Sequence, residues 1–123
     1  MNDASYPWFI LVPRRAEIRE IFELARHDQQ QLLDESSQLS RVLNRVFYAD
    51  KLNIAALGNM VPQLHIHQIV RYQSDRAWPN PVWGLFPAQP YPERVLQKTC
   101  AGLIEHLIDF IPDNNRGMTS GIC

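Results

Sequence analysis

The chain has 123 residues, of which 46% are hydrophobic, so it can bury one core of ordinary size but not a second. Its 12 basic and 13 acidic residues give a formal net charge of −1, which argues against a surface for polymeric nucleic acid. No apolar stretch approaches the roughly 18 residues of a membrane-spanning helix, and the first residues do not resemble a signal peptide, so we expect a cytoplasmic protein.

The first part of the chain predicts one strand followed by two helices. Residues 8–12 are aromatic and β-branched enough for a buried strand, and Pro13 ends it because proline cannot donate to a strand ladder. Residues 16–25 have apolar side chains at helical spacing and predict a short amphipathic helix. A longer helix is expected from Asp28, a suitable N-cap, to about residue 48.

Two further strands are expected in the middle of the chain. Residues 52–57 and 61–72 have the composition of strands, and Gly58 and Asn59 between them suit a turn. Pro62 implies that the second of these strands lies at an edge of the sheet or only starts there, because proline lacks the N–H that a central strand needs.

The last part of the chain predicts a loop, a helix and a tail. The segment 74–92 holds five of the nine prolines, so we expect an ordered loop or a flexible flap. Residues 93–108 return to helical spacing, and the polar residues 112–123 suggest a frayed tail. The chain is then a single domain over 1–123 with its core in about 6–111. This order of elements predicts an α+β fold, an antiparallel sheet with flanking helices.

Two closely spaced histidines form the most informative part of the sequence. Polar and apolar side chains alternate around them, and side chains two apart on a strand share a face. Gln63, His65 and His67 would therefore line one surface, while the residues between them point into the core. Two titratable rings side by side can supply a nucleophile or base and a proton-sharing partner near neutral pH.

Residues 63–67, Gln-Leu-His-Ile-His, resemble the signature of the histidine triad (HIT) superfamily, in which three histidines stand at alternate positions. Gln63 takes the first position, so the chain looks like a small bacterial-type HIT-like protein with glutamine in the triad. Three other segments resemble the family in the same order: a strand ending in proline and basic residues, a strand with a phosphate-facing asparagine, and the tryptophan-proline of the Hint branch. These are residues 8–15, residues 52–54 and Trp78-Pro79.

The resemblance implies a role for each polar residue. His65 matches the histidine that attacks the α-phosphorus of a nucleotide, which requires its inner N–H to have a fixed acceptor, most simply a main-chain carbonyl. His67 would bond phosphate oxygens or steer the proton of the leaving group. Asn53 and the backbone around Asn59 would hold the remaining oxygens. The implied chemistry needs no metal and no cofactor.

The implied function is a nucleotide phosphohydrolase or nucleotidyl transferase that forms a nucleotidyl-histidine from a nucleoside phosphoramidate or dinucleoside polyphosphate. The alternative is a nucleotide-binding HIT-like protein with little or no catalysis, because Gln63 cannot change its charge near pH 7.

The N-terminal strands of the family look abbreviated in this sequence. Family members carry a strand pair before the strand at 8–12, whereas only seven residues precede Trp8 here. Asp3 is the candidate for holding the ribose hydroxyls. Either the chain starts late or a partner subunit completes the pocket. An uncovered sheet edge favours self-association, so we expect a homodimer.

Other interpretations of the same residues are less specific. His65 and His67 could be partly buried histidines with satisfied hydrogen bonds. They could also give two ligands to zinc, but further ligands at a recognisable spacing are missing and the two cysteines are far apart. Trp78 and Trp83 are expected to pack against the protein and not against a base.

Overall fold

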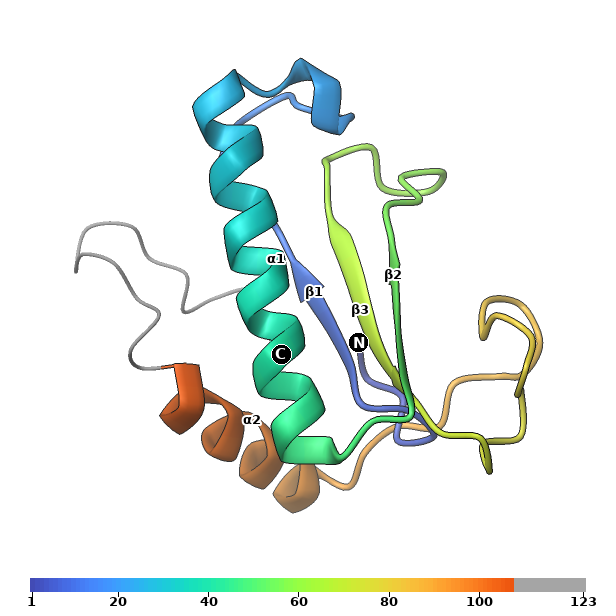
Figure 1. The fold of residues 1–123 in the computed structure, drawn as a ribbon. Coiled ribbons are helices and arrows are strands. Elements are labelled where there is room, and N and C mark those ends of the chain that lie inside the picture. The colour runs from blue at the N-terminus through green and yellow to red at the C-terminus, as the bar shows by residue number, and fades with distance from the viewer. Residues whose placement is uncertain (108–123) are drawn as a thin grey trace.

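The computed structural model describes residues 1–107, which form a three-stranded antiparallel sheet with two helices packed together on one of its faces (Figure 1). This arrangement confirms the predicted α+β fold. The tail predicted at residues 112–123 lies outside the described residues.

The central strand of the sheet is β3 (Ile66–Arg71), which pairs antiparallel with β1 (Trp8–Leu11) on one side and with β2 (Lys51–Ala55) on the other. All six of its residues are buried. The strand predicted over 61–72 is therefore longer than the observed one, and the prediction that it could lie at an edge of the sheet is wrong. Residues 61–65 do not pair with a neighbouring strand, because the backbone amide of Leu64 donates to the carbonyl of Ile18 (2.8 Å).

The long helix α1 (Arg26–Phe47) runs alongside the strands on one face of the sheet and buries leucines from one stripe, as its sequence predicts. It begins two residues before the predicted N-cap. Asp28 lies in its first turn, where a negative charge is favourable, and pairs with Arg15 at 2.6 Å. Tyr48 ends the helix in the left-handed conformation, with φ at 52°.

The helix predicted over residues 16–25 does not form, and this segment contains only a short 3₁₀ turn, η1 (Ile21–Glu23). Glu17 has a left-handed φ of 60°, which interrupts any helix at its start. The carbonyl of Ile18 is bonded to Leu64, so it is not free to accept from within a helix. The helical spacing of the apolar residues is a local pattern that this contact overrides.

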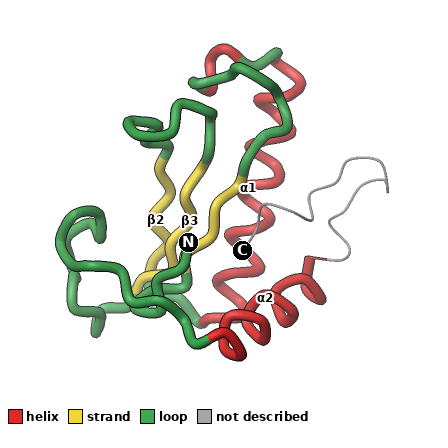
Figure 2. The backbone as a smooth tube through the Cα atoms, turned by 180° about the vertical axis from the view of Figure 1, so that it is seen from behind, coloured by secondary structure: helices red, strands yellow, loops and turns green. Residues whose placement is uncertain are grey.

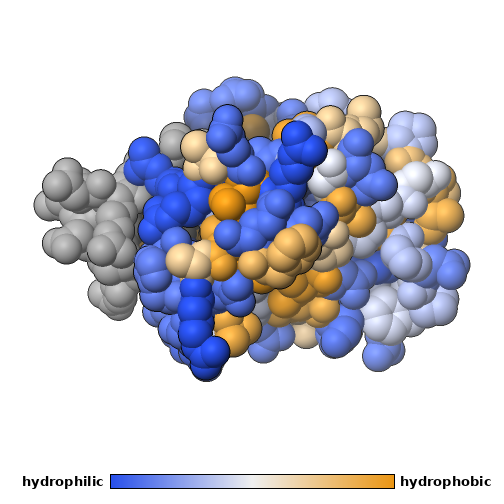
Figure 3. All heavy atoms as spheres, turned by 90° about the horizontal axis from the view of Figure 1, so that it is seen from above, coloured by the Kyte–Doolittle hydropathy of each residue, from blue (hydrophilic) through white to orange (hydrophobic). Residues whose placement is uncertain are grey.

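One end of the molecule, formed by η1 and the connection between β2 and β3, exposes several apolar side chains. Figure 3 views the molecule from this end and shows apolar side chains between polar ones. Those that the two segments expose are Ile21, Phe22, Leu57, Met60 and Val61.

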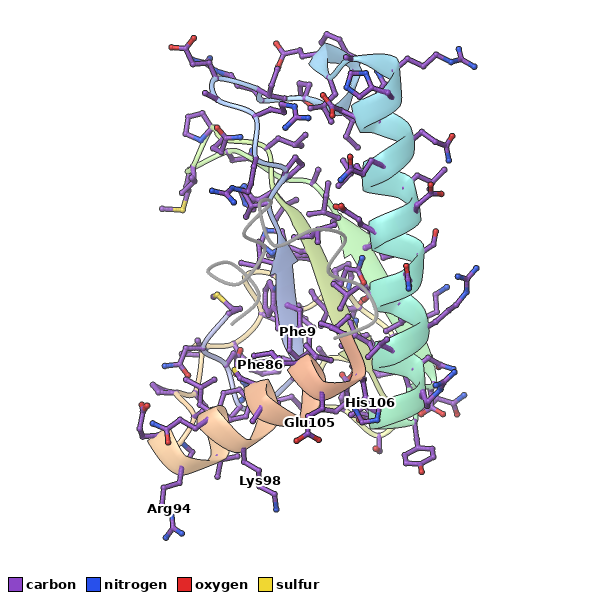
Figure 4. All side chains as sticks on the ribbon, turned by 90° about the vertical axis from the view of Figure 1, so that its left-hand side faces the viewer. Phe9, Phe86, Arg94, Lys98, Glu105 and His106 are labelled. Carbon is purple, nitrogen blue, oxygen red and sulfur yellow. The ribbon has the colours of Figure 1, made fainter. Side chains whose placement is uncertain are left out.

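The second helix, α2 (Glu93–Leu107), agrees with the predicted helix over 93–108 and packs against α1. Its residues Leu103 and Leu107 enter the core, whereas Arg94 and Lys98 point away from the sheet (Figure 4).

The loop 74–92 packs against the sheet on the face opposite α1, without regular helix or strand (Figure 2). Ala77 and Val82 of this loop are buried together with Trp8 and Ile69 of the sheet. The loop is therefore the ordered one of the two forms that the sequence predicts. It makes the second layer over the face that carries the histidines.

Gln68 is a fully buried amide in the mainly apolar layer between β3 and α1. Its Nε2 donates to the carbonyl (3.0 Å) and to the Oγ (2.8 Å) of Ser36. Its Oε1 accepts from the Oγ of Ser40 at 3.2 Å. A buried amide with these partners carries little desolvation penalty and ties the central strand to the helix.

We predict that replacing Gln68 with alanine lowers the free energy of unfolding by about 2–4 kcal/mol, because the change leaves a cavity and removes a partner from two serines. Urea unfolding followed by circular dichroism measures the loss. The control is Gln38→Ala on the exposed side of α1, which should change the free energy by less than about 0.5 kcal/mol. Equal effects of the two substitutions would contradict this role of Gln68.

Candidate functional site

The two histidines meet at the start of β3, on the face of the sheet that the loop 74–92 covers. His67 is the second residue of the strand and His65 comes just before it. Their ring centroids lie 4.9 Å apart with the planes at 79°, so the rings are side by side as the alternating pattern predicts. His67 is 8% exposed and His65 is half-buried, so His65 is the more accessible ring.

The ring of His65 is fixed by the backbone two residues earlier. Its Nδ1 lies 2.7 Å from the carbonyl oxygen of Gln63. A carbonyl can only accept, so Nδ1 carries the proton and the Nε2 of the neutral ring keeps its lone pair. This is the tautomer that a nucleophilic histidine needs, and its acceptor is a main-chain carbonyl, as expected from the sequence.

Gln63 contributes to the site in two ways, neither of which involves a charge. Its carbonyl holds His65, and its side-chain Nε2 donates to the carbonyl of Arg15 at 3.0 Å. The second bond joins the segment that follows β1 to the segment that precedes His65. Gln63 therefore orients His65 through its backbone carbonyl, whereas its side chain ties this segment to Arg15.

The ring of His67 is held by a residue that the sequence analysis did not assign to the site. The indole Nε1 of Trp8 donates to the Nδ1 of His67 at 3.0 Å, and both side chains are buried. The ring of Trp83 lies against both of them, with centroid distances of 5.5 Å to Trp8 and 5.8 Å to His67. Trp8 and His67 occupy positions on the same face of neighbouring strands. The sequence alone does not reveal this, because it does not give the register between the strands.

The environment of His67 favours its neutral form. Burial lowers the pKa of the ring, and the positive charges of His65, when protonated, and of the Met1 ammonium lower it further. His67 is therefore uncharged near pH 7.

Arg71 lies on the same face of β3 as His67 and is 1% exposed. It anchors the loop 74–92, called the covering loop below. Its Nε and Nη2 donate to the two carboxylate oxygens of Asp75 at 2.8 and 3.0 Å, and Nη2 also reaches the carbonyl of Asn80 at 3.0 Å. Burial acts to raise the pKa of the Asp75 carboxyl, but the bonds from Arg71 and from two backbone amides outweigh it, and the pKa is lowered. A buried guanidinium paired in this way holds residues 75–80 of the loop in place.

Asn53, a predicted phosphate ligand, lies on the same sheet face as His67, but its side-chain carbonyl already accepts a hydrogen bond. The Nη1 of Arg71 donates to its Oδ1 at 2.6 Å. Because a guanidinium can only donate, this bond fixes the orientation of the amide and leaves its NH₂ group as the donor for another partner. In the register of the sheet, Asn53 stands opposite Ile69, two residues along β3 from His67.

Asp3 and Asn59, the other two predicted ligands, make no hydrogen bond to either histidine among the described residues. Asp3 is 4% exposed, and its Oδ1 accepts from the amides of Ser5 (2.9 Å) and Gln89 (3.2 Å). It ties the N-terminal segment to the covering loop. Asn59 is exposed between β2 and β3, and no hydrogen bond or ring contact within residues 1–107 joins it to either histidine.

Within the described part of the chain, no group of three or more His, Cys, Asp or Glu residues could hold a metal ion. In the same part, no helix combines the length and the apolar character that a bilayer crossing requires.

Residues 1–74 match the family called HIT domain. A histidine triad protein from Marinobacter aquaeolei VT8 is 56% identical and superposes with a TM-score of 0.85, over 89% of this chain and 80% of that one. Histidine triad proteins from Sinorhizobium meliloti 1021 and Bradyrhizobium japonicum are 47% and 46% identical, with TM-scores of 0.84 and 0.83. They cover 87% and 86% of this chain and 79% of each of their own. No curated protein matches the sequence significantly.

The lowered pKa of His67 predicts that the protein loses stability as the pH falls below about 6.5, the ordinary value for histidine. Above that pH the ring is neutral in both the folded and the unfolded state. Below it the unfolded chain takes up the proton first, so the free energy of unfolding decreases until the pH reaches the folded pKa. Urea unfolding at several pH values between about 7.5 and 5.5 measures this loss.

His67→Gln is the matching variant, because glutamine does not titrate and its carbonyl can still accept from Trp8. Its stability should fall less with acid than that of the parent protein. The same acid dependence in both proteins would assign the effect to other groups.

Proposed function

Because the chain belongs to the histidine triad (HIT) family, we propose that it is a nucleotide phosphohydrolase or nucleotidyl transferase that works through a nucleotidyl-histidine at His65. The observation that carries the proposal is the 2.7 Å bond from the Nδ1 of His65 to the carbonyl of Gln63. It gives a half-buried, accessible ring the tautomer that attacks phosphorus.

In the proposed reaction, the Nε2 of His65 attacks the α-phosphorus of a nucleoside phosphoramidate or a dinucleoside polyphosphate. The bond from phosphorus to the amine nitrogen, or to the bridging oxygen, breaks, and its electron pair leaves with the departing group. A departing amine takes up a proton from solvent and is released as the free amine, and a departing nucleotide is released as its phosphate anion. Water then attacks the same phosphorus, loses a proton to solvent and breaks the bond to His65. The products are a nucleoside monophosphate and free His65.

His67 and Asn53 are the proposed donors to the phosphoryl oxygens. The Nδ1 of His67 is already bonded to Trp8, so its Nε2–H is the group available to the substrate. The NH₂ of Asn53 has the same chemistry, because its carbonyl is bonded to Arg71. Donors of this kind favour the charge that shifts onto the oxygens as the bond to phosphorus changes.

We predict that incubation with adenosine 5′-phosphoramidate gives an adenylyl adduct on His65. Mass spectrometry after rapid quenching without acid detects it, because the phosphorus–nitrogen bond to histidine is labile in acid. His65→Ala should remove the adduct and lower kcat by at least about 10³-fold, since the covalent step has no other nucleophile. His27→Ala, at a histidine whose side chain is 77% exposed on α1, is the control and should leave the rate unchanged.

The same experiment distinguishes the enzyme from a nucleotide-binding protein with little or no catalysis. Turnover that persists in His65→Ala would refute the catalytic assignment. Tight binding of the nucleotide without turnover in the parent protein would support the binding function instead.

We also propose that the protein forms a homodimer. In the described part of the chain β1 and β2 are both edge strands, and Ile54 on β2 is 52% exposed. Light scattering should give twice the mass of one chain, and a monomer over the whole working concentration range would contradict the proposal.

A further inference from the structure

We propose that Trp8 is a positioning residue that fixes the proton of His67 on Nε2 and makes His67 a neutral hydrogen-bond donor to the phosphoryl group, and not an imidazolium acid. The catalytic meaning of this inference rests on the proposed function at His65. The tautomer itself is a property of the ring and its neighbours, and it can be measured without any reaction.

The argument begins with the chemistry of the indole. Its N–H can only donate, does not titrate and has no acceptor atom to offer instead. The Nε1 of Trp8 lies 3.0 Å from the Nδ1 of His67. Nδ1 must therefore present a lone pair, and a neutral His67 carries its proton on Nε2. If Nδ1 carried the proton, this hydrogen bond would be lost, and the N–H of Trp8 would face the N–H of His67.

The packing around Trp8 holds its indole N–H in one orientation in the absence of substrate. Trp8 is 8% exposed and lies in β1 opposite Ile69 of the central strand. Its ring meets that of Trp83 edge to face at 5.5 Å, and it is buried in one cluster with Tyr6 and Val82. The indole N–H therefore keeps its direction without spending binding energy on ordering a side chain.

The charges around His67 act in the same direction as Trp8. Along β3 the neighbouring ring is His65, and from the N-terminal segment the Met1 ammonium faces the site while donating to the carbonyl of Trp8 at 3.0 Å. Both oppose a positive charge on His67. Arg71, on the same face of β3, is paired with Asp75, and from the loop side His67 meets the uncharged ring of Trp83.

A consequence follows for the chemistry. With Nδ1 occupied, Nε2 is the ring atom of His67 left for a substrate, and it reaches the substrate as a neutral N–H. It can share this proton with a phosphoryl or leaving-group oxygen, but it does not bring a full positive charge to the site.

The test uses ¹⁵N-histidine-labelled protein and long-range ¹H–¹⁵N spectra, in which the two tautomers of a neutral ring have different nitrogen shifts. The His67 signals are assigned by their loss in His67→Gln. In the parent protein they should show a bare Nδ1 and a protonated Nε2 near neutral pH. In Trp8→Phe the Nδ1–H form should appear and the pKa of His67 should rise, because the indole bond to its neutral form is gone.

Trp8→Phe also removes part of a buried ring and could disturb folding. A second variant with 3-benzothienylalanine at position 8 keeps the shape of tryptophan and lacks only the N–H. The matched control is Trp83→Phe, because Trp83 contacts the same ring but its Nε1 has no hydrogen-bond partner among the described residues. Phenylalanine keeps an aromatic ring against Trp8, so this control should leave the proton of His67 on Nε2.

Kinetics with adenosine 5′-phosphoramidate complete the test. Both position-8 variants should lose about tenfold in kcat, with a smaller change in KM and a larger loss at acid pH than at alkaline pH. A gain in rate with acid would show that the imidazolium is the working form and would overturn the proposal. So would His67 nitrogen shifts that stay unchanged in the benzothienylalanine variant. If the parent protein shows no turnover, the proposed function fails, and the spectra still decide the tautomer.

Discussion

Both histidines of the site are held through their Nδ1 atoms, and the two hydrogen bonds run in opposite directions. His65 donates from Nδ1 to the carbonyl of Gln63, whereas His67 accepts at Nδ1 from the indole of Trp8. Two chemically identical rings 4.9 Å apart therefore hold opposite tautomers. One presents a lone pair at Nε2 and the other presents a proton. The choice of partner alone therefore makes one ring suited to act as a nucleophile and the other suited to donate a hydrogen bond.

The rest of the fold keeps these partners in place. The central strand is buried on both faces, with Gln68 bonded to α1 on one side and Arg71 bonded to the covering loop on the other. Trp8 reaches His67 because β1 pairs directly with β3, and Ile10 stands opposite His67 in that ladder. A slip of one residue between these strands would turn Trp8 to the helix side of the sheet. The tautomer of His67 thus depends on strand register.

The sequence predicts the parts of this structure that depend on neighbours along the chain. The two long helices and the shared face of His65 and His67 follow from side-chain spacing, and a carbonyl partner for His65 follows from the chemistry of imidazole. Contacts between distant residues could not be predicted. Trp8 lies 59 positions from His67, and the short helix expected over 16–25 is prevented by a backbone bond from Leu64.

Asn53 illustrates the same limit within the site itself. Its position on the sheet face that carries His67 could be predicted, but its bond to Arg71 could not. An arginine in a strand gives no sign by itself that it will be buried and paired with residues of two other segments. The direction of the asparagine amide is set by that arginine and hence by the covering loop.

The role of Gln63 has a consequence for how the three-histidine signature tolerates change. The oxygen that orients His65 belongs to the peptide unit, and every amino acid supplies the same oxygen at that place. Exchange of the first residue of the signature therefore removes a titratable ring without removing the acceptor that holds His65. What the side chain adds is a link to Arg15, for which an amide serves. The main chain sets the orientation of the His65 ring, whatever side chain occupies position 63.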